Sequence, residues 1–400
     1  MPNVEHGGNP TPPGAPMKTH NLPLALLAVL AMGTPALASA EVPIDVIAGS
    51  DISFEGLLQT DGYWYDSDVL SLDADAGDGH DTDFGLRRAE IGFKGKGPGN
   101  FEWALGYDAS GDGKFLDAFA RYKLDGSSSR YLQAGQFKQP NSLEELSSTK
   151  NNDFIAKALV TNTFAVGRRL GIGTGIGGDD WGLAASAFGR ELTRHRAHGS
   201  GFGARGYWAP VNEKGRFLHL GLSYAGYDTD ADSLRLRVRP GADFANRLVD
   251  TGTLADTDRI ATIGAEAVWV NGPVKLQGEY LSSKVSRHGA GHGDFTATGG
   301  YASAVWNLTG ETWGYKGGTP STPLPANPAS GMWQLGLRYD TIDLDDAGVE
   351  GGTLDTITAG MNWYWRSNFK FMLDYVKASS DRRGIGDDPG IIEARAQFSW

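Results

Sequence analysis

Apolar and polar residues alternate along much of the chain, and the last ten residues show this most clearly. Ile392, Ala394, Ala396, Phe398 and Trp400 share one parity, and charged or polar residues fill the positions between them. Successive side chains of a strand point to opposite faces, so this segment has one apolar and one polar face. The pattern predicts a β-strand that ends at the aromatic C-terminal residue.

Similar alternation recurs upstream and divides the chain into strands and connections. Clear examples lie at residues 101–108, 218–224, 357–365 and 369–375. The strands predicted in this way begin near residues 51, 84, 100, 115, 130, 170, 181, 202, 216, 259, 274, 297, 331, 353, 368 and 391. The count is sixteen, and an even number returns both ends of the chain to the same side.

The predicted connections alternate between short and long. Short ones lie at 97–99, 271–273 and 366–368, and long ones at 139–169, 228–258 and 378–390. Short periplasmic turns and longer outer loops are typical of outer-membrane barrels. The Pro- and Gly-rich segment 309–330 is an exception, because it lies where a short turn is expected. Either that turn is long or the strand count is wrong there.

The N-terminal region has the pattern of an exported protein. Residues 17–40 combine a basic start, a short apolar run and an Ala-Ser-Ala ending, which predicts a secretory signal peptide. Residues 1–16 have no place in such a signal and are interpreted as an over-called start, so translation is expected to begin at Met17. The expected barrel domain is 41–400, and no later segment is apolar for long enough to form a transmembrane helix.

Composition supports a membrane barrel and limits other classes. The chain has 57 Gly, 11 Trp, 14 Tyr and 17 Phe and no Cys, yet its mean hydropathy is only −0.32. Many aromatic residues in a polar chain fit a barrel with an apolar outside and a wet inside. The net charge of −12 argues against a nucleic-acid partner. The fold class predicted is therefore all-β, a transmembrane antiparallel β-barrel of sixteen strands in the bacterial outer membrane.

Six sequence motifs along the chain give more specific information than the alternation does. They include FGLRRAEIGFKGK (84–96), GQFKQPNSLEELSSTKNNDFI (135–155), FAVGRRLGI (164–172), RLVDTG (247–252), VWVNGPVKLQGEY (268–280) and LTGETWGY (308–315). In this order they resemble the phosphate-selective porin O/P family. The resemblance implies an anion-preferring homotrimeric pore with an inward-folded third outer loop, and relatives that carry phosphate or polyphosphate. The C-terminal residues Phe398 and Trp400 resemble the signal read by the barrel-assembly machinery.

The family's selectivity rests on pore-lining cations, which the strand parity helps to locate. The candidates here are Arg88, Lys94, Arg121, Lys123, Lys138, Arg168, Arg169, Arg235, Arg237 and Arg239. An anion filter must replace part of the hydration shell at several weak sites. Arginine offers a planar fork that matches phosphate oxygens, and lysine offers a compact charge.

Local pattern places Lys94 with Arg88 on the second predicted strand and Arg121 with Lys123 on the fourth. The other cations lie around the third outer loop or in the fifth. Arg88 alternates with Ala89 and is expected to face the lumen, whereas Arg87 has the other parity and is expected near the rim. Lys138 precedes the third outer loop, and Arg168 and Arg169 follow it. The segment SLRLRVRP (233–240) places three arginines at alternate positions in the fifth outer loop.

Several of these cations have a simpler explanation that stays open. Arg168 and Arg169 could bridge acidic residues of their own loop, and Arg88 with Glu90 could be a plain ion pair. The arginines of 235–239 could bind lipopolysaccharide phosphates from outside. Lumen carboxylates such as Glu90 would weaken a preference for anions.

No enzyme motif accompanies the barrel pattern. H-E-x-x-H is absent, and the histidines carry no Ser-containing motif. Catalysis, a cofactor and a metal site are therefore not predicted. The expected function is passive diffusion of small anions, with membrane lipid and lipopolysaccharide as surroundings. The alternative is a general or sugar-permeable diffusion porin with weak charge preference.

Overall fold

The computed structural model describes residues 42–47, 50–74, 81–126, 129–193, 199–229, 231–289 and 291–400. The predicted signal peptide (17–40) and the predicted extra segment (1–16) lie outside these residues, so both stay predictions. No helix in the described part of the chain is both long enough and apolar enough to cross a membrane.

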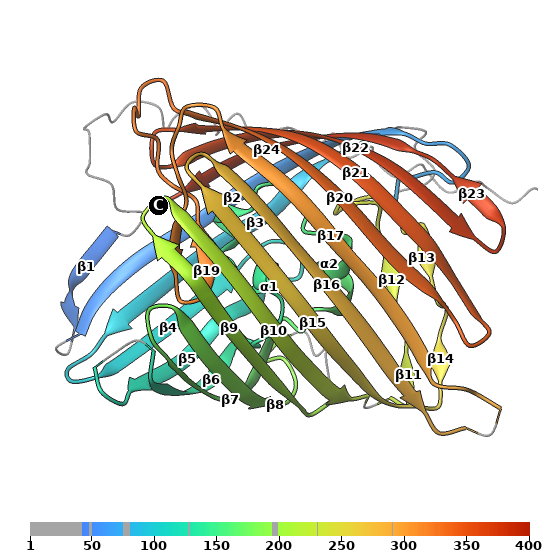
Figure 1. The fold of residues 1–400 in the computed structure, drawn as a ribbon, viewed down its shortest axis with the longest axis horizontal. Coiled ribbons are helices and arrows are strands. Elements are labelled where there is room, and N and C mark those ends of the chain that lie inside the picture. The colour runs from blue at the N-terminus through green and yellow to red at the C-terminus, as the bar shows by residue number, and fades with distance from the viewer. Residues whose placement is uncertain are drawn as a thin grey trace, which may run out of the picture. The chain divides into compact units, whose positions relative to one another are not determined.

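Sixteen long strands form the wall of the barrel (Figure 1). In chain order they are β2 (Ser50–Asp66), β3 (Thr82–Lys96), β4 (Phe101–Asp108), β5 (Lys114–Lys123), β6 (Tyr131–Lys138), β7 (Arg168–Gly177), β8 (Trp181–Phe188), β9 (Gly201–Glu213), β10 (Arg216–Asp228), β15 (Thr257–Asn271), β16 (Val274–Arg287), β17 (Phe295–Asn307), β20 (Met332–Asp346), β21 (Val349–Trp365), β22 (Phe369–Arg382) and β24 (Gly390–Ser399). The prediction of sixteen strands is confirmed, and the long connection between β17 and β20 is a long turn rather than a missed strand.

Antiparallel pairing runs from each wall strand to the next, and β2 pairs with β24 to close the sheet. A short strand, β1 (Val42–Ile47), adds to the first residues of β2, and β23 (Ile385–Asp387) pairs with the end of β22. Closure removes the free edges of the sheet, so every wall strand has two hydrogen-bonded neighbours.

The wall is apolar outside and polar inside. In β20, Gln334, Arg338 and Asp340 are buried, whereas Leu335 and Leu337 are 41% and 56% exposed. A water-soluble protein would bury the leucines and expose the charges. This inverted alternation fits a wall that contacts lipid and encloses polar groups.

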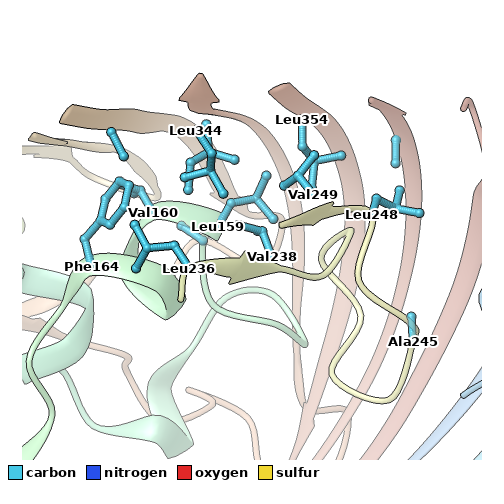
Figure 2. Packing of buried hydrophobic residues seen from close by; sticks show 14 of the residues in the cluster. Leu159, Val160, Phe164, Leu236, Val238, Ala245, Leu248, Val249, Leu344 and Leu354 are labelled. Atoms are coloured by element: carbon cyan, nitrogen blue, oxygen red, sulfur yellow. The ribbon is translucent and has the colours of Figure 1, made fainter. Parts of the chain in front are cut away.

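Two connections at the long-loop end fold into the barrel. Loop 3 (139–167) contains α1 (Leu143–Leu146), the 3-10 helix η2 (Thr149–Asn151) and α2 (Leu159–Phe164), and loop 5 (229–256) contains β11 (Ser233–Leu234), β12 (Arg237–Val238), β13 (Val249–Asp250) and β14 (Leu254–Ala255). Their apolar side chains join those of the inner wall in one buried cluster (Figure 2). The inward third loop predicted above is therefore confirmed.

The long connection at the opposite end also packs on inward-facing side chains. Turn 6 (308–331) contains a small hairpin of β18 (Gly314–Lys316) and β19 (Thr319–Ser321). Its two turn residues, Gly317 and Gly318, have φ of 60° and 78°. Positive φ at both central residues is the type I′ geometry that favours glycine. Turn 6 thus explains the Pro- and Gly-rich exception in the sequence.

Candidate functional site

Loop 3 is anchored by buried ion pairs of the inner wall. Arg338 donates its Nε to Asp340 (2.7 Å) and its Nη1 to the carbonyl of Ala156 (3.0 Å). Arg395 in turn donates its Nη1 to the carbonyl of Ile155 (2.7 Å). Both residues are 2% exposed, so their buried guanidiniums link the wall rigidly to the loop.

Wall carboxylates hold the backbone amides of the same loop. Asp374 accepts from the amide of Ile155 (2.7 Å), and Asp340 accepts from that of Leu159 (3.1 Å). Glu279 accepts from the first two amides of α1 (2.9 and 2.8 Å). These contacts fix loop 3 against the half of the wall formed by β16, β20, β22 and β24.

The side of loop 3 that faces away from this wall is tied down by lysines. The Lys138 ammonium donates to the carbonyls of Glu145 and Ser147 (2.8 Å for Ser147). Lys157 pairs with the Glu145 carboxylate. Burial alone would raise the pKa of Glu145, but Lys157 and Lys138 outweigh it and lower this pKa to about 2.

Loop 5 has an apolar face and a cationic face. Leu236 and Val238 are buried in the cluster with α2 and the inner wall, as Figure 2 shows. Arg235 and Arg237 have the opposite parity and are exposed. The alternation therefore directs these two guanidiniums away from the wall on which the loop packs. Asp250 accepts from Arg235 Nε (2.8 Å).

The tip of loop 5 reaches β2 and β3. Arg87 Nε lies 2.6 Å from Asp243 Oδ2. Phe244 packs on Tyr63 with ring centroids 5.1 Å apart, and a side chain at Gly85 would collide with Phe244 at 2.7 Å. Loop 5 is therefore pinned to the first wall strands as well as to the cluster.

Arg87 is a residue that alternation alone misplaced. The register pairs Gln59 with Arg88 and Thr60 with Leu86, so Arg87 is the extra residue of a β-bulge. The prediction that Arg87 has the parity opposite to that of Arg88 was wrong. The bulge turns Arg87 toward loop 5, next to Arg88.

Two more arginines belong to the cationic face of loop 5. Arg239 donates its Nε to the carbonyl of Ala245 (2.7 Å). Burial, with Arg239 and Arg237 close by, lowers the pKa of Arg247. Arg247 was not among the predicted cations, since nothing local distinguishes it from a surface arginine. We call Arg235, Arg237, Arg239 and Arg247 the loop 5 arginines.

Most predicted cations on the wall are paired with carboxylates. Arg88 lies 3.4 Å from Glu90, Lys94 lies 2.6 Å from Glu55, and Lys123 lies 2.6 Å from Glu102. Arg168 donates to both oxygens of Asp117, at 2.9 and 3.1 Å. The simpler explanation of Arg88 as an ion pair with Glu90 therefore has direct support. The simpler explanation of Arg168, a bridge to acidic residues of the third loop, does not hold, because its partner Asp117 lies on β5.

Besides Lys138, two wall cations remain, and aromatic rings hold both. Arg121 lies 4.2 Å from the ring centre of Tyr131 and donates to the amide oxygen of Gln133 (2.7 and 3.0 Å). Arg169 lies 5.3 Å from the ring centre of Tyr227 and is 5% exposed. Arg121 therefore faces the open lumen more than Arg169 does.

Open space remains beside the inserted loops. One cavity is lined by Lys94, Lys138, Arg168 and the end of α1. A second, larger cavity is lined by Arg121, Lys138, wall residues of β5 to β9 and the tip of turn 6. The two cavities share Asp117, Lys138 and Leu146 in their lining, and both are lined by predicted cations.

The two residues of the predicted assembly signal lie in an aromatic row. Trp400 lies 5.4 Å from Phe398 and 5.7 Å from Phe54, measured between ring centres. Phe398 continues the row to Phe369 at 5.0 Å. The backbone of Trp400 also exchanges two hydrogen bonds with Gly56 at 3.1 and 3.2 Å. The C-terminal residue therefore completes the closing pair of strands.

Within the described ranges, no cluster of three or more His, Cys, Asp or Glu residues could hold a metal ion. Three buried carboxylates, those of Glu279, Asp340 and Asp374, instead hold the backbone of loop 3. Those acids and cations together give a polar passage with fixed charges, and the arrangement suits permeation.

Comparison with known proteins agrees with this geometry. The family model for the phosphate-selective porin O and P matches residues 59–400. Porin O of Pseudomonas aeruginosa is 32% identical over 220 residues, which is 47% of this chain and 50% of that relative. The matched region therefore spans about half the length of that curated relative.

Solved structures share the architecture at low identity. The outer-membrane channel DcaP of Acinetobacter baumannii has a TM-score of 0.59 at 12% identity and covers 90% of this chain and 99% of its own. An anion-selective porin from Comamonas acidovorans has a TM-score of 0.54 at 12% identity and covers 88% of this chain and all of its own. At these identities the likeness concerns the fold.

Proposed function

Because this chain belongs to the phosphate-selective porin O and P family of outer-membrane barrels, we propose that it is a passive pore that prefers small anions, phosphate among them. A porin is a channel rather than an enzyme, in agreement with the prediction from sequence. The cationic face of loop 5 is the observation that carries the proposal. Arg237 is exposed on that face, and within the described residues it has neither an ion pair nor a side-chain hydrogen bond.

Anions enter past the loop 5 arginines and continue around loop 3. There the path meets Lys94, Lys138 and Arg168 on one side and Arg121 on the other. Guanidiniums at alternate positions of an extended segment stand about 7 Å apart, so an anion can pass from one to the next. The inward packing of loop 5 supports this role over the alternative of binding lipopolysaccharide from outside.

A general or sugar-permeable porin is the second candidate. Two observations favour it: four predicted wall cations are neutralised by carboxylates, and Phe119, Tyr131 and Tyr207 line the larger cavity. Such a pore would have weak charge preference. The charge of the loop 5 arginines distinguishes the two functions, because it would give the pore a preference for anions.

We propose that the chain assembles as a homotrimer. In this assembly the low side of the wall, which is formed by the short strands β4 to β8, lies between subunits. The wall strands β4 to β8 have 8 to 10 residues, whereas the other wall strands from β9 to β22 have 13 to 17. Eight residues tilted by about 45° rise roughly 19 Å, less than the apolar band of about 25 Å. A second copy would cover this low wall better than lipid, and small outward residues such as Ala118 and Ala187 permit close approach.

The ionic preference is tested in a planar bilayer under a potassium chloride gradient. The reversal potential is expected to have the sign of an anion-selective pore, although the net charge of −12 would by itself predict the opposite sign. Added phosphate is expected to block chloride current, because a tighter-binding anion dwells longer at the filter. Combined replacement Arg235→Ala, Arg237→Ala and Arg239→Ala is expected to weaken the block more than it changes conductance.

Each result separates the candidates. Cation selectivity of the unmodified pore would favour the general porin. Anion selectivity without phosphate block would keep the anion pore and reject phosphate as the preferred solute. Block that survives the triple replacement would remove the three arginines from the path.

A further inference from the structure

Glycines on the inner face of β7 and β8 make room for two tyrosine rings. A Cβ atom at Gly175 of β7 would lie 2.5 Å from the ring of Tyr131, and one at Gly182 of β8 would lie 2.5 Å from the ring of Tyr207. Tyr131 comes from β6 and Tyr207 from β9, while β7 pairs with β8 between them. The two rings therefore lie on the wall and lean toward each other, which only the missing side chains of the glycines permit.

Both tyrosines line the larger cavity and present unbonded hydroxyls to it. Tyr131 and Tyr207 are half-buried. Within the described ranges neither hydroxyl has a hydrogen-bond partner. A phenolic hydroxyl donates one hydrogen bond and accepts others. The two hydroxyls are therefore available to the polar groups of a solute.

A guanidinium with a fixed orientation stands beside this pair. The Arg121 guanidinium lies 4.2 Å from the ring centre of Tyr131 and 5.2 Å from that of Phe119. Its Nε and Nη2 both donate to the amide oxygen of Gln133, at 3.0 and 2.7 Å. Nη1 has no partner among the described residues. The planar fork of an arginine matches phosphate oxygens, and a fork that is already held in place loses little freedom when it binds one.

Carboxylates leave the charge of Arg121 available. In the part of the chain that the structure describes, Arg121 has no ion pair with a carboxylate. Asp117, which lines the same cavity, is bound by Arg168 (2.9 and 3.1 Å). The other two carboxylates of the lining, Asp179 and Asp180, lie in the short turn that joins β7 and β8. An anion inside the cavity therefore meets a guanidinium that no acid neutralises.

The tip of turn 6 adds a second cation. Lys316 is exposed and lines the larger cavity. Its neighbours are anchored, because the Tyr315 hydroxyl lies 2.7 Å from Nδ1 of His219 and the Gly318 carbonyl accepts from Nη2 of Arg205 (2.8 Å). The Lys316 ammonium itself has neither an ion pair nor a hydrogen bond to any other described residue.

Cations that favour an anion pore and tyrosines that favour a sugar-permeable porin thus lie in one cavity. We propose that this larger cavity is a binding site for phosphorylated sugars, in which Arg121 binds the phosphate and the hydroxyls of Tyr131 and Tyr207 hydrogen-bond with the sugar. Lys316 supplies a second positive charge. The inference rests on the proposed anion pore and names a class of solute for it. Inorganic phosphate lacks the sugar contacts, and an uncharged sugar lacks the contact with the guanidinium.

Block of the chloride current through the pore in planar bilayers tests the site. Glucose 6-phosphate is expected to halve the current at a concentration roughly 3- to 10-fold lower than inorganic phosphate does, because additional hydrogen bonds hold its sugar. Glucose is expected not to block at these concentrations, because it has no charge to bind Arg121.

Two lumen variants separate the sugar contacts from the phosphate contact. Combined replacement Tyr131→Phe and Tyr207→Phe keeps both rings, and should raise the half-blocking concentration of glucose 6-phosphate to that of inorganic phosphate, whose own value should not change. Arg121→Lys keeps the charge but loses the fork. It should raise the half-blocking concentration of glucose 6-phosphate by roughly 10-fold, while the reversal potential keeps its sign.

Tyr122→Phe is the matched control. It removes a hydroxyl from the residue next to Arg121, but Tyr122 is 43% exposed on the outer face of the wall, so the block by each solute should stay unchanged. Each variant must first show the heat-dependent gel migration of a folded barrel. The comparison of the three solutes in the unmodified pore does not depend on any variant.

Glucose 6-phosphate that blocks no better than inorganic phosphate would overturn the proposal. A stronger block that survives both lumen variants would also overturn it, because the sugar phosphate would then bind elsewhere in the pore. Block by glucose at the same concentration would show that the phosphate is not recognised. Failure of the anion pore would instead appear in the reversal potential, which is measured before any of these solutes is added.

Discussion

Arg395 and Asp61 face each other across the seam where the last wall strand meets the first. They are direct partners in the register of β24 and β2, and Arg395 donates its Nε and Nη2 to the two carboxylate oxygens, at 2.6 Å each. Both side chains are fully buried. The same guanidinium also binds the carbonyl of Ile155, so one residue links barrel closure to the position of loop 3.

Asp61→Asn is expected to destabilise the barrel strongly. The change leaves Arg395 as a buried charge with no full partner, which costs about 3 to 5 kcal/mol. The temperature at which the folded band converts to the unfolded band on a gel should therefore fall. A double variant, Asp61→Leu with Arg395→Met, should recover much of that loss, because replacing a whole buried pair by apolar groups is often neutral. A double variant no more stable than Asp61→Asn would contradict this explanation.

The wall could be predicted from sequence because its pattern is local. Alternation and connections gave every wall strand, and even the less accurate predicted start near 353 falls inside β21 (Val349–Trp365). The cationic face of loop 5 also followed from parity. These features depend on neighbours in the chain, and the period of a strand does not depend on the fold around it.

The details of the site depend on register and distant contacts, which local pattern does not contain. The bulge at Arg87 reverses the parity on which its placement relied. Whether Lys123 is free or paired depends on the register of β4 and β5, which places Glu102 opposite Arg121 and within reach of Lys123. The insertion of turn 6 depends on Tyr315 meeting His219, far away in the chain.

Glu145 is expected to make the barrel sensitive to strong acid but not to mild acid. Its folded pKa of about 2 lies below its ordinary value of about 4.3. The stabilisation is therefore complete above about pH 4.3 and is lost as the pH falls through about 2, and it amounts to at most about 3 kcal/mol. The melting temperature of Glu145→Gln should be lower than that of the unmodified protein at pH 7 and should converge with it near pH 2.

Glu213→Gln is a matched control for that measurement. Glu213 lies in an exposed pair with Arg216, and its side chain is 66% exposed. Its replacement should change the free energy of unfolding by no more than about 0.5 kcal/mol at either pH, so the melting temperature should hardly change. Equal melting temperatures of Glu145→Gln and the unmodified protein at pH 7 would show that the Glu145 pair with Lys157 contributes nothing to loop 3.

Trp400→Asp is expected to reduce the amount of barrel in the outer membrane. The change breaks the aromatic row that joins Phe398 and Phe54 and places a charge on the lipid-facing side of the last strand. Trp400→Phe keeps an aromatic residue and should restore most of the level. The measurement is the folded, heat-modifiable band in isolated outer membranes. Normal levels of Trp400→Asp would argue against a role of this residue in assembly.

Asp243→Asn is expected to loosen the tip of loop 5 without unfolding the barrel. Burial alone would raise the pKa of Asp243, but Arg87 and Arg88 hold it well below its usual range, so the carboxylate is charged at every physiological pH. Neutralising it removes the charge from the bond to Arg87, whose side chain is 24% exposed. Hydrogen bonds to charged groups contribute about 1.5 to 3 kcal/mol, and this partial exposure reduces the expected cost to about 1 to 2 kcal/mol.

The loosened tip should be visible as faster trypsin cleavage at the loop 5 arginines, while the melting temperature of the barrel changes little. Opening by about 1.4 kcal/mol corresponds to a tenfold rise in the cleavable fraction. Asp256→Asn is the matched control, since it makes the same substitution in the same loop at a residue whose side chain is 44% exposed. Cleavage rates that rise equally in both variants would mean that a charge in loop 5, rather than the bond from Asp243 to Arg87, protects the loop. If Asp243→Asn alone accelerates cleavage, the bulge at Arg87 is the anchor that holds the cationic face in place.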